Sequence, residues 1–554
     1  MAQDLARVDG PRSFGTAALH GLGFLILAAL VTVIVGLQQR AAGAYMAEFS
    51  ATRADEAGHV VTGLMVAQYL GSDWPAPLAF LADYGLHYPR VVLGLWPPLY
   101  YVLQGIWFTL LEPSTPAVLL LPAVLAALLV ASTGWVAADR LGLLPGVAVG
   151  AVLLVLPALR EAILVVGLDL PLSLLILWAA FAYAAYLRSR SLRTGLLFGL
   201  LASAAILTKA TGLALLLLPP MAVLVTRRFR LLRERGFWLP LLLIVILAGP
   251  WTIGTYPLVS AAAPAAVPGP DARLLAEAGA LWHQLGAVLL ALAAAGGAFA
   301  LADTRRATAE PLPLVLLLVS VCFAATLAMA PPAGPASVLP LCAPAVILAA
   351  AGGLRLIRLV TRDWTTLAGL AVALVMLLAA LPALMMVATK PVIGMDAAAQ
   401  TFLADASGPP VVLVFADETG EGALVAAVAQ RDHRRRSYVV PARVALAAPV
   451  SDPSAANSPS AAHEDLLAGL GRLGAGYLAI EDRSGGADDA LARRMEAVLA
   501  AHPERFKLLG RFPRSDGTGG TRLFALVDGG RGAPNAAPDV VPGAAAGSAP
   551  GPVQ

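Results

Sequence analysis

Long apolar stretches follow one another through most of the chain, and their length indicates the fold class. Eleven of them approach the roughly 20 residues that a helix needs to cross the hydrocarbon core of a bilayer, which is about 30 Å thick. They cover residues 17–37, 116–136, 143–166, 171–187, 195–209, 211–225, 237–253, 284–302, 312–330, 336–353 and 365–388. The pattern predicts a polytopic α-helical membrane protein with about 11 transmembrane helices.

The first apolar stretch follows Arg7 and Arg12 and ends near Leu37. It is too long for the core of a usual signal peptide, so we interpret it as a retained first span. Residues 1–15 are then a cytoplasmic N-terminus, and 16–390 form the transmembrane domain.

Arginines predict the topology, because loops that stay in the cytoplasm keep an excess of Lys and Arg. Arginine-rich and arginine-poor connections alternate along the spans. This alternation puts an acidic loop, 38–115, the turn at Asp169 and the C-terminal region on the non-cytoplasmic side. It requires that Pro97–Leu111 does not cross, and this short, aromatic-rich segment is expected to lie at the interface as a juxtamembrane helix.

From about residue 393 the apolar runs shorten to strand length and alternate with helical stretches. Strands are expected at 411–415, 477–480 and 522–527, and helices at 421–430 and 488–501. Residues 393–529 are therefore predicted to form a small soluble α/β domain. Within it, 450–463 is expected to be a loop, and the Gly/Ala/Pro-rich residues 530–554 a disordered tail.

Composition agrees with a membrane protein and excludes one class of partner. The chain is 58% hydrophobic and 13% charged, whereas a soluble domain has about 25% charged residues. The net charge is only +3, and the arginines lie between apolar stretches rather than in one groove. Membrane lipids are expected partners and nucleic acid is not.

Polar residues in the first outer loop supply the first chemical signal. Asp55 and His59 are four residues apart at a predicted helix start and would share a face, with Glu56 beside Asp55. A capping box, in which Thr52 caps the helix and Asp55 reaches back, explains the same residues without any function.

Two further charged residues lie where spans meet on the same side. Asp169 lies in the turn before a span, where it could equally cap the helix. Lys209, one of only three lysines, lies between two spans; snorkelling to headgroups is its alternative. An ionisable group at that depth favours a functional site, and a cation suits a phosphate. Arg160 and Glu161 are expected to pair with each other.

Four short motifs occur in an order that resembles the membrane-embedded GT-C glycosyltransferases. They are Asp55-Glu56-Ala57, Pro97-Pro98-Leu99-Tyr100-Tyr101, Asp169-Leu170-Pro171 and Leu207-Thr208-Lys209. Over residues 15 to 390 the chain is most similar to bacterial relatives of protein O-mannosyltransferases and aminoarabinose (lipid A) transferases. The resemblance implies sugar transfer from a polyprenyl-phosphate donor to a glycan, lipid or protein acceptor.

The resemblance also implies roles for individual residues. Asp55, Glu56 and Asp169 would be catalytic, and Lys209 would lie near the donor phosphate. A carboxylate can accept the acceptor's hydroxyl proton, and Asp55 is our choice for that base. A single displacement would invert the anomeric configuration. No cofactor is required by the sequence, although Asp55 and Asp169 could hold a divalent cation, Mg or Mn.

The chain departs from the family at two positions. Trp96 stands where a His or Lys commonly precedes the Pro-Pro-Leu helix, and Ala336 stands in place of the usual Arg-Tyr pair. His87 and Arg90, just upstream of Trp96, are candidate replacements as phosphate ligands, although an exposed polar loop explains them as well.

Two other classes of function stay open. A catalytically silent relative would use the outer domain for binding or scaffolding, and a transporter or flippase would also keep charges among its spans. The composition favours a bacterial cell inner membrane, with the active site and C-terminal domain periplasmic. The sugar and the acceptor cannot be named from these residues.

Overall fold

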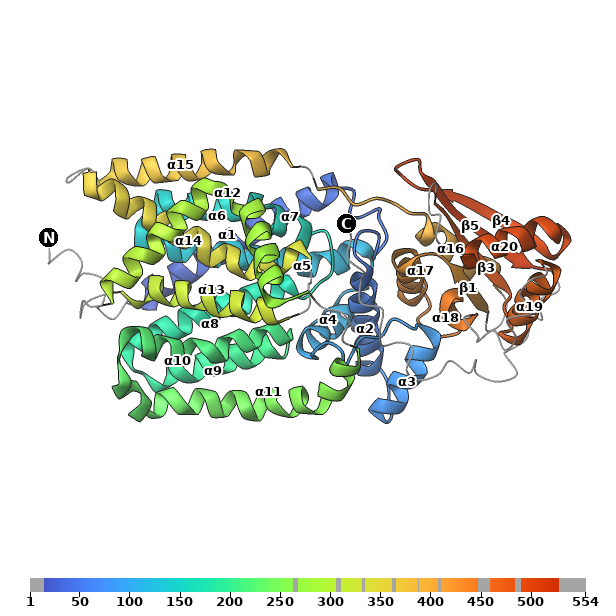
Figure 1. Ribbon diagram of the computed structural model, residues 1–554, viewed down its shortest axis with the longest axis horizontal. Coiled ribbons are helices and arrows are strands. Elements are labelled where there is room, and N and C mark those ends of the chain that lie inside the picture. The colour runs from blue at the N-terminus through green and yellow to red at the C-terminus, as the bar shows by residue number, and fades with distance from the viewer. Residues whose placement is uncertain are drawn as a thin grey trace.

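The computed structural model of the protein describes residues 14–262, 268–304, 310–330, 334–360, 365–386, 388–406, 410–446, 459–483 and 490–527. It has a helical membrane domain at one end and a sheet domain at the other, with three short helices between them (Figure 1). Most of the predicted cytoplasmic N-terminus and the predicted tail at 530–554 lie outside the described residues.

The membrane domain contains eight helices that are long and apolar enough to cross a bilayer among the described residues. They are α1 (Phe14–Ala41), α5 (Thr115–Leu141), α8 (Asp169–Ser189), α11 (Arg235–Ala261), α12 (Pro270–Asp303), α13 (Pro311–Met329), α14 (Leu339–Val360) and α15 (Thr365–Met385). The protein is therefore a multi-pass membrane protein, as predicted.

The other three predicted spans are shorter helices, so the count of 11 crossings stays a prediction. These helices are α6 (Leu143–Val155), α9 (Leu192–Ile206) and α10 (Ala214–Thr226). The stretch predicted as one span at 143–166 divides at Leu156, and α7 (Pro157–Ala162) follows it. The division has a local cause, because Pro157 disfavours helical backbone at Leu156, whose ψ is 136°.

The first outer loop forms α2 (Ala54–Leu70), α3 (Pro77–His87) and α4 (Leu99–Leu110), which lie between the bundle and the sheet (Figure 1). Helix α4 has 12 residues and so spans about 18 Å at 1.5 Å per residue, less than the bilayer core. Its length agrees with the predicted juxtamembrane position. It packs closely on α2, where a side chain at Gly105 would collide with Val66.

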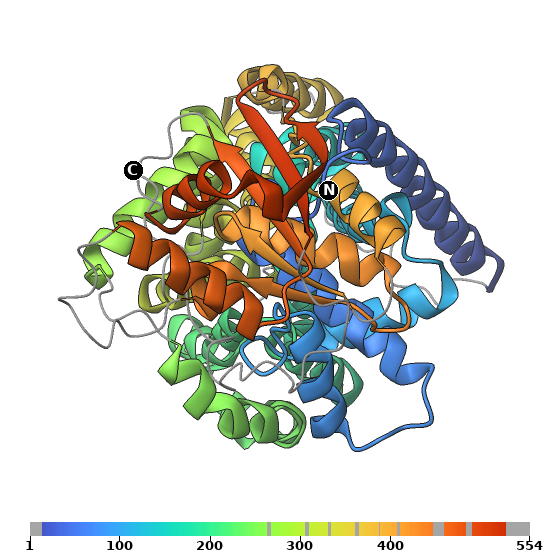
Figure 2. The same ribbon diagram turned by 90° about the vertical axis from the view of Figure 1, so that its right-hand side faces the viewer.

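The C-terminal domain has a five-stranded mixed sheet of order β2-β1-β3-β5-β4. Strand β1 is parallel to β2 and β3, whereas β5 is antiparallel to β3 and β4. The strands are β1 (Val411–Phe415), β2 (Tyr438–Pro441), β3 (Tyr477–Arg483), β4 (Phe506–Pro513) and β5 (Gly519–Leu526). Figure 2 looks onto this domain, with the membrane helices behind it.

Helices cover the sheet, and one of the sequence predictions needs correction. The helices are α16 (Met395–Asp405), α17 (Glu418–Arg431), α18 (Ala442–Ala445), α19 (Pro459–Arg472) and α20 (Ala490–Ala501). Residues 459–463, predicted as loop, begin α19, because a proline at the first helical position is pre-organised for helix. Strands β2 and β4 were not predicted.

The sheet domain is held directly against the first outer loop. Gly422 of α17 packs on Ser50 and Ala57, at the start of α2, with no room for a side chain. The buried carboxylate of Glu48 accepts hydrogen bonds from the backbone N–H groups of Ile393 and Gly394, at 2.8 Å each. The loop that carries Asp55 is thus fixed from both domains.

Candidate functional site

The start of α2 places the first acidic residue of the site. Arg53 is the N-cap residue, and no side chain caps the helix, so the capping-box interpretation of Thr52 and Asp55 is wrong. Asp55 instead accepts two hydrogen bonds from Arg53, from Nε at 3.2 Å and from Nη2 at 2.8 Å. Such a fork holds a carboxylate in a defined orientation.

Asp169 lies against the same arginine from the opposite side. It is the first residue of α8 and makes no capping bond. Its Oδ2 is 3.8 Å from Arg53 Nη1, and its Oδ1 accepts a 2.5 Å hydrogen bond from Lys209 Nζ. Asp169 and Lys209 are only 4% and 6% exposed. Tertiary packing therefore brings Asp55, Arg53, Asp169 and Lys209 into one chain of alternating charge, which we call the charge cluster.

Aromatic residues form one wall of the charge cluster. His59 Nε2 is 3.8 Å from Asp55 Oδ2, and its Nδ1 is 2.8 Å from the hydroxyl of the buried Tyr101. Lys209 Nζ lies 5.8 Å from the centre of the Trp96 ring, within the range of a cation–π contact. Trp96 also meets His59 edge-on. The residue that departs from the family pattern thus lies inside the site.

The surroundings keep the Asp55 carboxylate ionised. Burial raises the pKa of Asp55, but the nearby His59 ring and the positive charge of Arg53 outweigh it, so the pKa lies well below its ordinary value. The Asp55 side chain is nevertheless 38% exposed, so a substrate can reach it. While Arg53 is bound to it, the Asp55 carboxylate is ionised but is a weak base.

A second carboxylate flanks the lysine. Glu277 of α12 is near enough to Lys209 and Asp169 to interact with both charges. It accepts a 3.2 Å hydrogen bond from the hydroxyl of Ser337. Ala336, where the family's Arg-Tyr pair is missing, is buried beside Ser337. Glu277 could not be selected from the sequence, because no local pattern indicates that it lies near Lys209.

Glu56 is engaged in a separate buried ion pair. Lys390 Nζ donates to both of its carboxylate oxygens, at 2.7 and 2.9 Å, and neither residue is more than 4% exposed. The same carboxylate accepts from the backbone N–H groups of Ser50 and Val166. Lys390 was missed by the sequence analysis, although its rarity as one of three lysines was a usable signal.

The candidate phosphate ligands His87 and Arg90 contact the C-terminal domain. His87 stacks on Tyr438, with 4.0 Å between ring centres, and its Nδ1 is 3.0 Å from the carbonyl of Ser437. Arg90 donates to Glu421 at 3.1 Å. The structure does not bring these side chains into the charge cluster.

The expected pairing of Arg160 with Glu161 is wrong. Arg160 donates instead to the backbone carbonyls of Ala383, Leu384 and Met386, at the end of α15. Glu161 is electrostatically coupled to Arg53 and His283. Neighbours in sequence point in different directions on a helix, which explains the difference.

The donor set of Asp55 and Asp169 does not fit a metal ion as it stands. In the part of the chain that the structure describes, no three side chains of His, Cys, Asp or Glu converge in a way that could hold one. The guanidinium of Arg53 lies between the two carboxylates. A bound Mg or Mn therefore stays a prediction.

No family model matches the sequence, and a search of curated proteins finds no match. Solved structures do match. ArnT from Cupriavidus metallidurans superposes in its apo state with a TM-score of 0.56, at 15% identity over 91% of this chain and 98% of ArnT. Bound to undecaprenyl phosphate, it superposes with a TM-score of 0.55, at 15% identity over 92% and 99%. The archaeal oligosaccharyltransferase AglB from Archaeoglobus fulgidus is less similar, with a TM-score of 0.47 at 12% identity over 92% and 74%.

The likeness to ArnT covers the membrane domain, the outer-loop helices and the C-terminal domain together. At 15% identity it is a likeness of fold, and individual residues keep only the roles that their own geometry supports. The chain therefore has the fold of ArnT, a membrane glycosyltransferase of the GT-C superfamily, which confirms the predicted resemblance at the level of the fold.

Proposed function

We propose that this protein is a glycosyltransferase that moves a sugar from a polyprenyl-phosphate donor to an acceptor hydroxyl at the periplasmic face of a bacterial inner membrane. The observation that carries the proposal is the charge cluster. Two carboxylates and two cations come from three distant parts of the chain and meet at the end of the bundle next to the outer loop. ArnT, whose fold the chain shares, has been crystallised with undecaprenyl phosphate.

Arg53 and Lys209 are the groups we assign to the donor phosphate. Guanidinium and ammonium groups bind phosphate through charge-assisted hydrogen bonds, and a guanidinium can do so with two parallel bonds. The negative charge on the phosphate grows as the sugar leaves, and cations already in place stabilise it at that moment. Lys209 is 6% exposed, so little water competes for it.

Asp55 is the group we assign to the acceptor. The acceptor oxygen attacks the anomeric carbon, the bond from that carbon to the phosphate oxygen breaks, and the hydroxyl proton passes to Asp55. The polyprenyl phosphate departs with the bonding electrons. One such displacement inverts the anomeric carbon. When the phosphate draws Arg53 away from Asp55, the pKa of Asp55 rises towards its ordinary value, and the carboxylate becomes a better base.

The remaining site residues are assigned positioning roles. Both oxygens of Glu56 are occupied by Lys390 and by backbone N–H groups, which suits a residue that fixes the start of α2. His59, held by Tyr101, keeps Asp55 oriented. Asp169 holds Lys209 and Arg53 in place.

The test is transfer of radiolabelled sugar from polyprenyl-phosphate donors to a membrane extract by the purified protein. Asp55→Asn is expected to lower transfer by about 100-fold or more, as removal of a general base does. Asp139→Asn, at the opposite end of the bundle and in contact with Arg140, is the matched control and should keep full activity.

Equal transfer by wild type and Asp55→Asn would show that the base is misassigned. No transfer by a folded wild-type protein with any donor would favour the silent-relative or transporter alternatives. NMR of the product separates the mechanisms, since retention of the donor's anomeric configuration contradicts a single displacement.

A further inference from the structure

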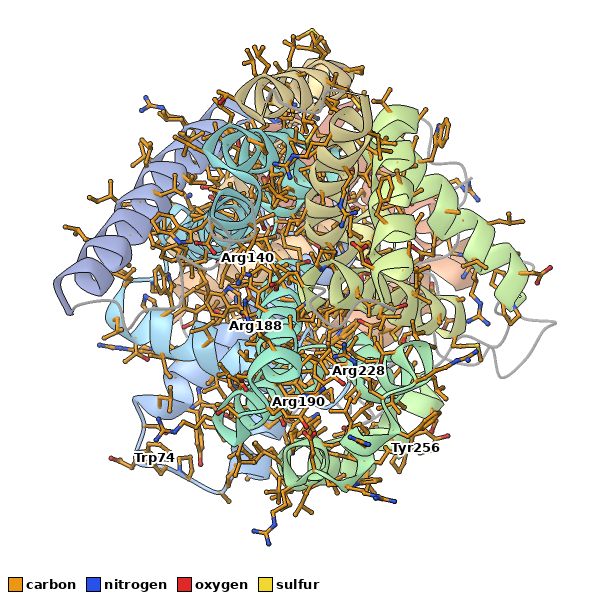
Figure 3. The ribbon with its side chains drawn as sticks, turned by 90° about the vertical axis from the view of Figure 1, so that its left-hand side faces the viewer. Trp74, Arg140, Arg188, Arg190, Arg228 and Tyr256 are labelled. Carbon is orange, nitrogen blue, oxygen red and sulfur yellow. The ribbon has the colours of Figure 1, made fainter. Side chains whose placement is uncertain are left out.

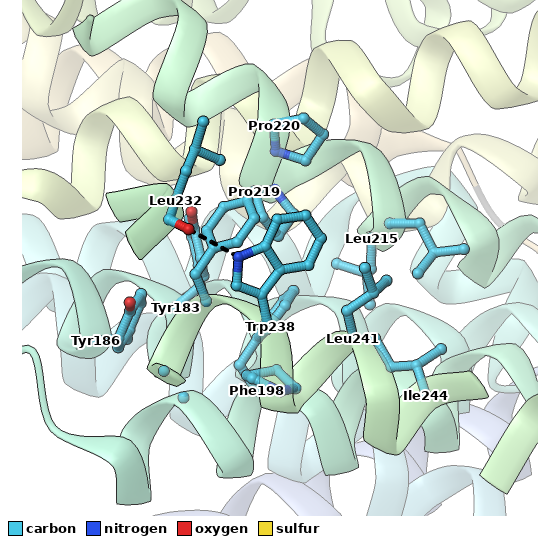
Figure 4. Close-up of a pocket in the computed structure, with 15 residues that line it drawn as sticks. Tyr183, Tyr186, Phe198, Leu215, Pro219, Pro220, Leu232, Trp238, Leu241 and Ile244 are labelled. Atoms are coloured by element: carbon cyan, nitrogen blue, oxygen red, sulfur yellow. Dashed lines mark hydrogen bonds between the residues drawn. The ribbon is translucent and has the colours of Figure 1, made fainter. Parts of the chain in front are cut away.

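A cavity of about 240 Å³ lies among helices α8, α9, α10 and α11. Its lining is almost entirely aliphatic and aromatic, with Trp238 at its centre in Figure 4. It is formed by the last turns of α8 and the first turns of α9 and α11, so it lies towards the end of the bundle away from the sheet domain (Figure 1). The charge cluster, by contrast, includes the first residue of α8.

Water is a poor occupant for this space. Apolar cavities of about 150 Å³ stay dry and bind apolar molecules instead. Two of the helices that form the cavity, α8 and α11, are long and apolar enough to cross a bilayer. Exposed apolar side chains on α11, such as Leu242 at 52% exposure, are therefore expected to face lipid. Hydrocarbon chains of the bilayer would lie next to the cavity, so we expect an apolar lipid chain to occupy it.

One polar group in the cavity wall indicates that the ligand carries a hydrogen-bond acceptor as well as a hydrocarbon chain. The side chain of Tyr183 is 2% exposed, and its hydroxyl has no hydrogen-bond partner within the described residues. An unpaired buried hydroxyl costs about 1–3 kcal/mol. An ester carbonyl of a phospholipid could accept its hydrogen bond, whereas the chain of a polyprenyl lipid contains no acceptor.

The positive charge beside the cavity indicates that the lipid headgroup is anionic. Arg190 lies seven residues after Tyr183, about 10 Å further along the helix direction. Figure 3, which faces this end, shows Arg188, Arg190 and Arg228 gathered there. Arg188 and Arg190 each lie 3.5 Å from a carboxylate, that of Glu310 and of Glu234, so a phosphate would share them with these groups. The short helix of residues 229–233 adds Arg230 and Arg233. Cations near a membrane surface attract anionic lipids.

We propose that this cavity is a binding site for an anionic phospholipid. One acyl chain lies among the apolar side chains, an ester carbonyl accepts from Tyr183, and the phosphate lies at the arginines. The site is separate from the sugar-transfer site, and the proposal does not depend on the proposed function. Because the lipid would bridge α8, α10 and α11, its binding stabilises the fold.

The experiment uses the full-length protein, delipidated in mild detergent and titrated with phosphatidylglycerol, phosphatidylcholine or undecaprenyl phosphate. Bound lipid is counted by native mass spectrometry, and unfolding is followed by differential scanning fluorimetry. Phosphatidylglycerol is expected to bind at one saturable site and to raise the Tm. Phosphatidylcholine should bind more weakly.

Neighbouring substitutions supply matched controls. Leu241→Trp fills the cavity and should abolish the saturable binding, whereas Leu242→Trp adds the same ring on the exposed face and should not. Tyr183→Phe removes one oxygen without changing the packing. It should weaken phosphatidylglycerol binding about three- to tenfold, the effect of one hydrogen bond.

Three results would overturn the proposal. They are the absence of saturable phosphatidylglycerol binding to wild type, equal binding by both tryptophan variants, and stronger binding of undecaprenyl phosphate that Tyr183→Phe leaves unchanged. The last result would identify the cavity as a site for a polyprenyl chain instead.

Discussion

At the scale of single residues, each charge of the proposed site is satisfied by another member, and this arrangement determines how it can work. Arg53 touches both Asp55 and Asp169, and Lys209 touches Asp169. A partly buried guanidinium shared by two carboxylates is well placed to move to a phosphate when one arrives. This arrangement suits an exchange of partners during the proposed reaction.

Arg53→Lys tests the value of the guanidinium fork. A lysine keeps the charge but cannot bind Asp55 and a phosphate with paired parallel bonds. We expect kcat/KM to fall about 10- to 100-fold, corresponding to about 1.4–2.8 kcal/mol, with a rise in the KM for the donor. Arg140→Lys, whose Nη1 is 3.0 Å from Glu310 at the other end of the bundle, should leave both constants unchanged. An unaltered KM in Arg53→Lys would remove Arg53 from the donor site.

The lowered pKa of Asp55 predicts a dependence of stability on pH. A carboxylate whose pKa is lower in the folded state stabilises the fold above its unfolded pKa, about 3.9, and loses that effect as the pH falls through the folded value. At pH 7, Asp55→Asn should therefore have a lower Tm than wild type, and the difference should shrink between pH 4 and pH 2. A difference that stays constant over this range would contradict the pairing with Arg53 and His59.

At the scale of secondary-structure elements, contacts from several distant parts of the chain hold the start of α2 in place. Glu56 joins it to Lys390 on the linker that leads to the sheet domain, and to the N–H of Val166, three residues before Asp169. Gly422 of α17 presses on the neighbouring turn. The positions of Asp55 and Asp169 therefore depend on contacts that neither residue makes itself.

The Glu56–Lys390 pair should behave as a buried ion pair. Removing one partner leaves the other charge buried without a counter-ion, which lowers the free energy of unfolding by about 3–5 kcal/mol. Replacing both partners by apolar groups is far less destabilising. Glu56→Gln and Lys390→Met should each lower the Tm strongly, and the double variant should recover most of the loss. If the double variant is as unstable as the sum of the two singles, the pair is not coupled.

At the scale of the whole molecule, the proposed function requires the charge cluster and the sheet domain to face the same side of the membrane. The three outer-loop helices lie between the bundle and the sheet (Figure 1). The arginines labelled in Figure 3 lie at the opposite end. The positive-inside rule predicts that this end is cytoplasmic and that the sheet domain lies on the periplasmic side.

Cysteine labelling tests this orientation. With Cys322 and Cys342, both buried, replaced by Ala, single cysteines are introduced by Glu504→Cys in the sheet domain or Ser189→Cys at the far end of α8. A membrane-impermeant maleimide should label the first in intact spheroplasts and the second only after permeabilisation. Labelling in the reverse order would place the active site in the cytoplasm and exclude a periplasmic reaction.

Much of the architecture follows from local patterns that are visible in the sequence. Apolar length alone located the helices of the membrane domain, because a span must satisfy its backbone hydrogen bonds within itself. The change of pattern near residue 393 located the sheet domain. Strands β2 and β4 escaped detection: β2 has only four residues, and most residues of β4 are at least partly exposed, so neither shows a clear apolar pattern.

The sequence by itself determined the class of the protein and the identity of Asp55, Asp169 and Lys209 as candidates, because charges among apolar spans are rare and costly. Only the tertiary structure decided which charges meet. It added Arg53, Lys390 and Glu277, and it engaged His87 and Arg90 with the sheet domain. The physical reason is that a span's local pattern records its affinity for lipid, whereas ion pairs between residues 40 or 334 positions apart depend on how the helices pack.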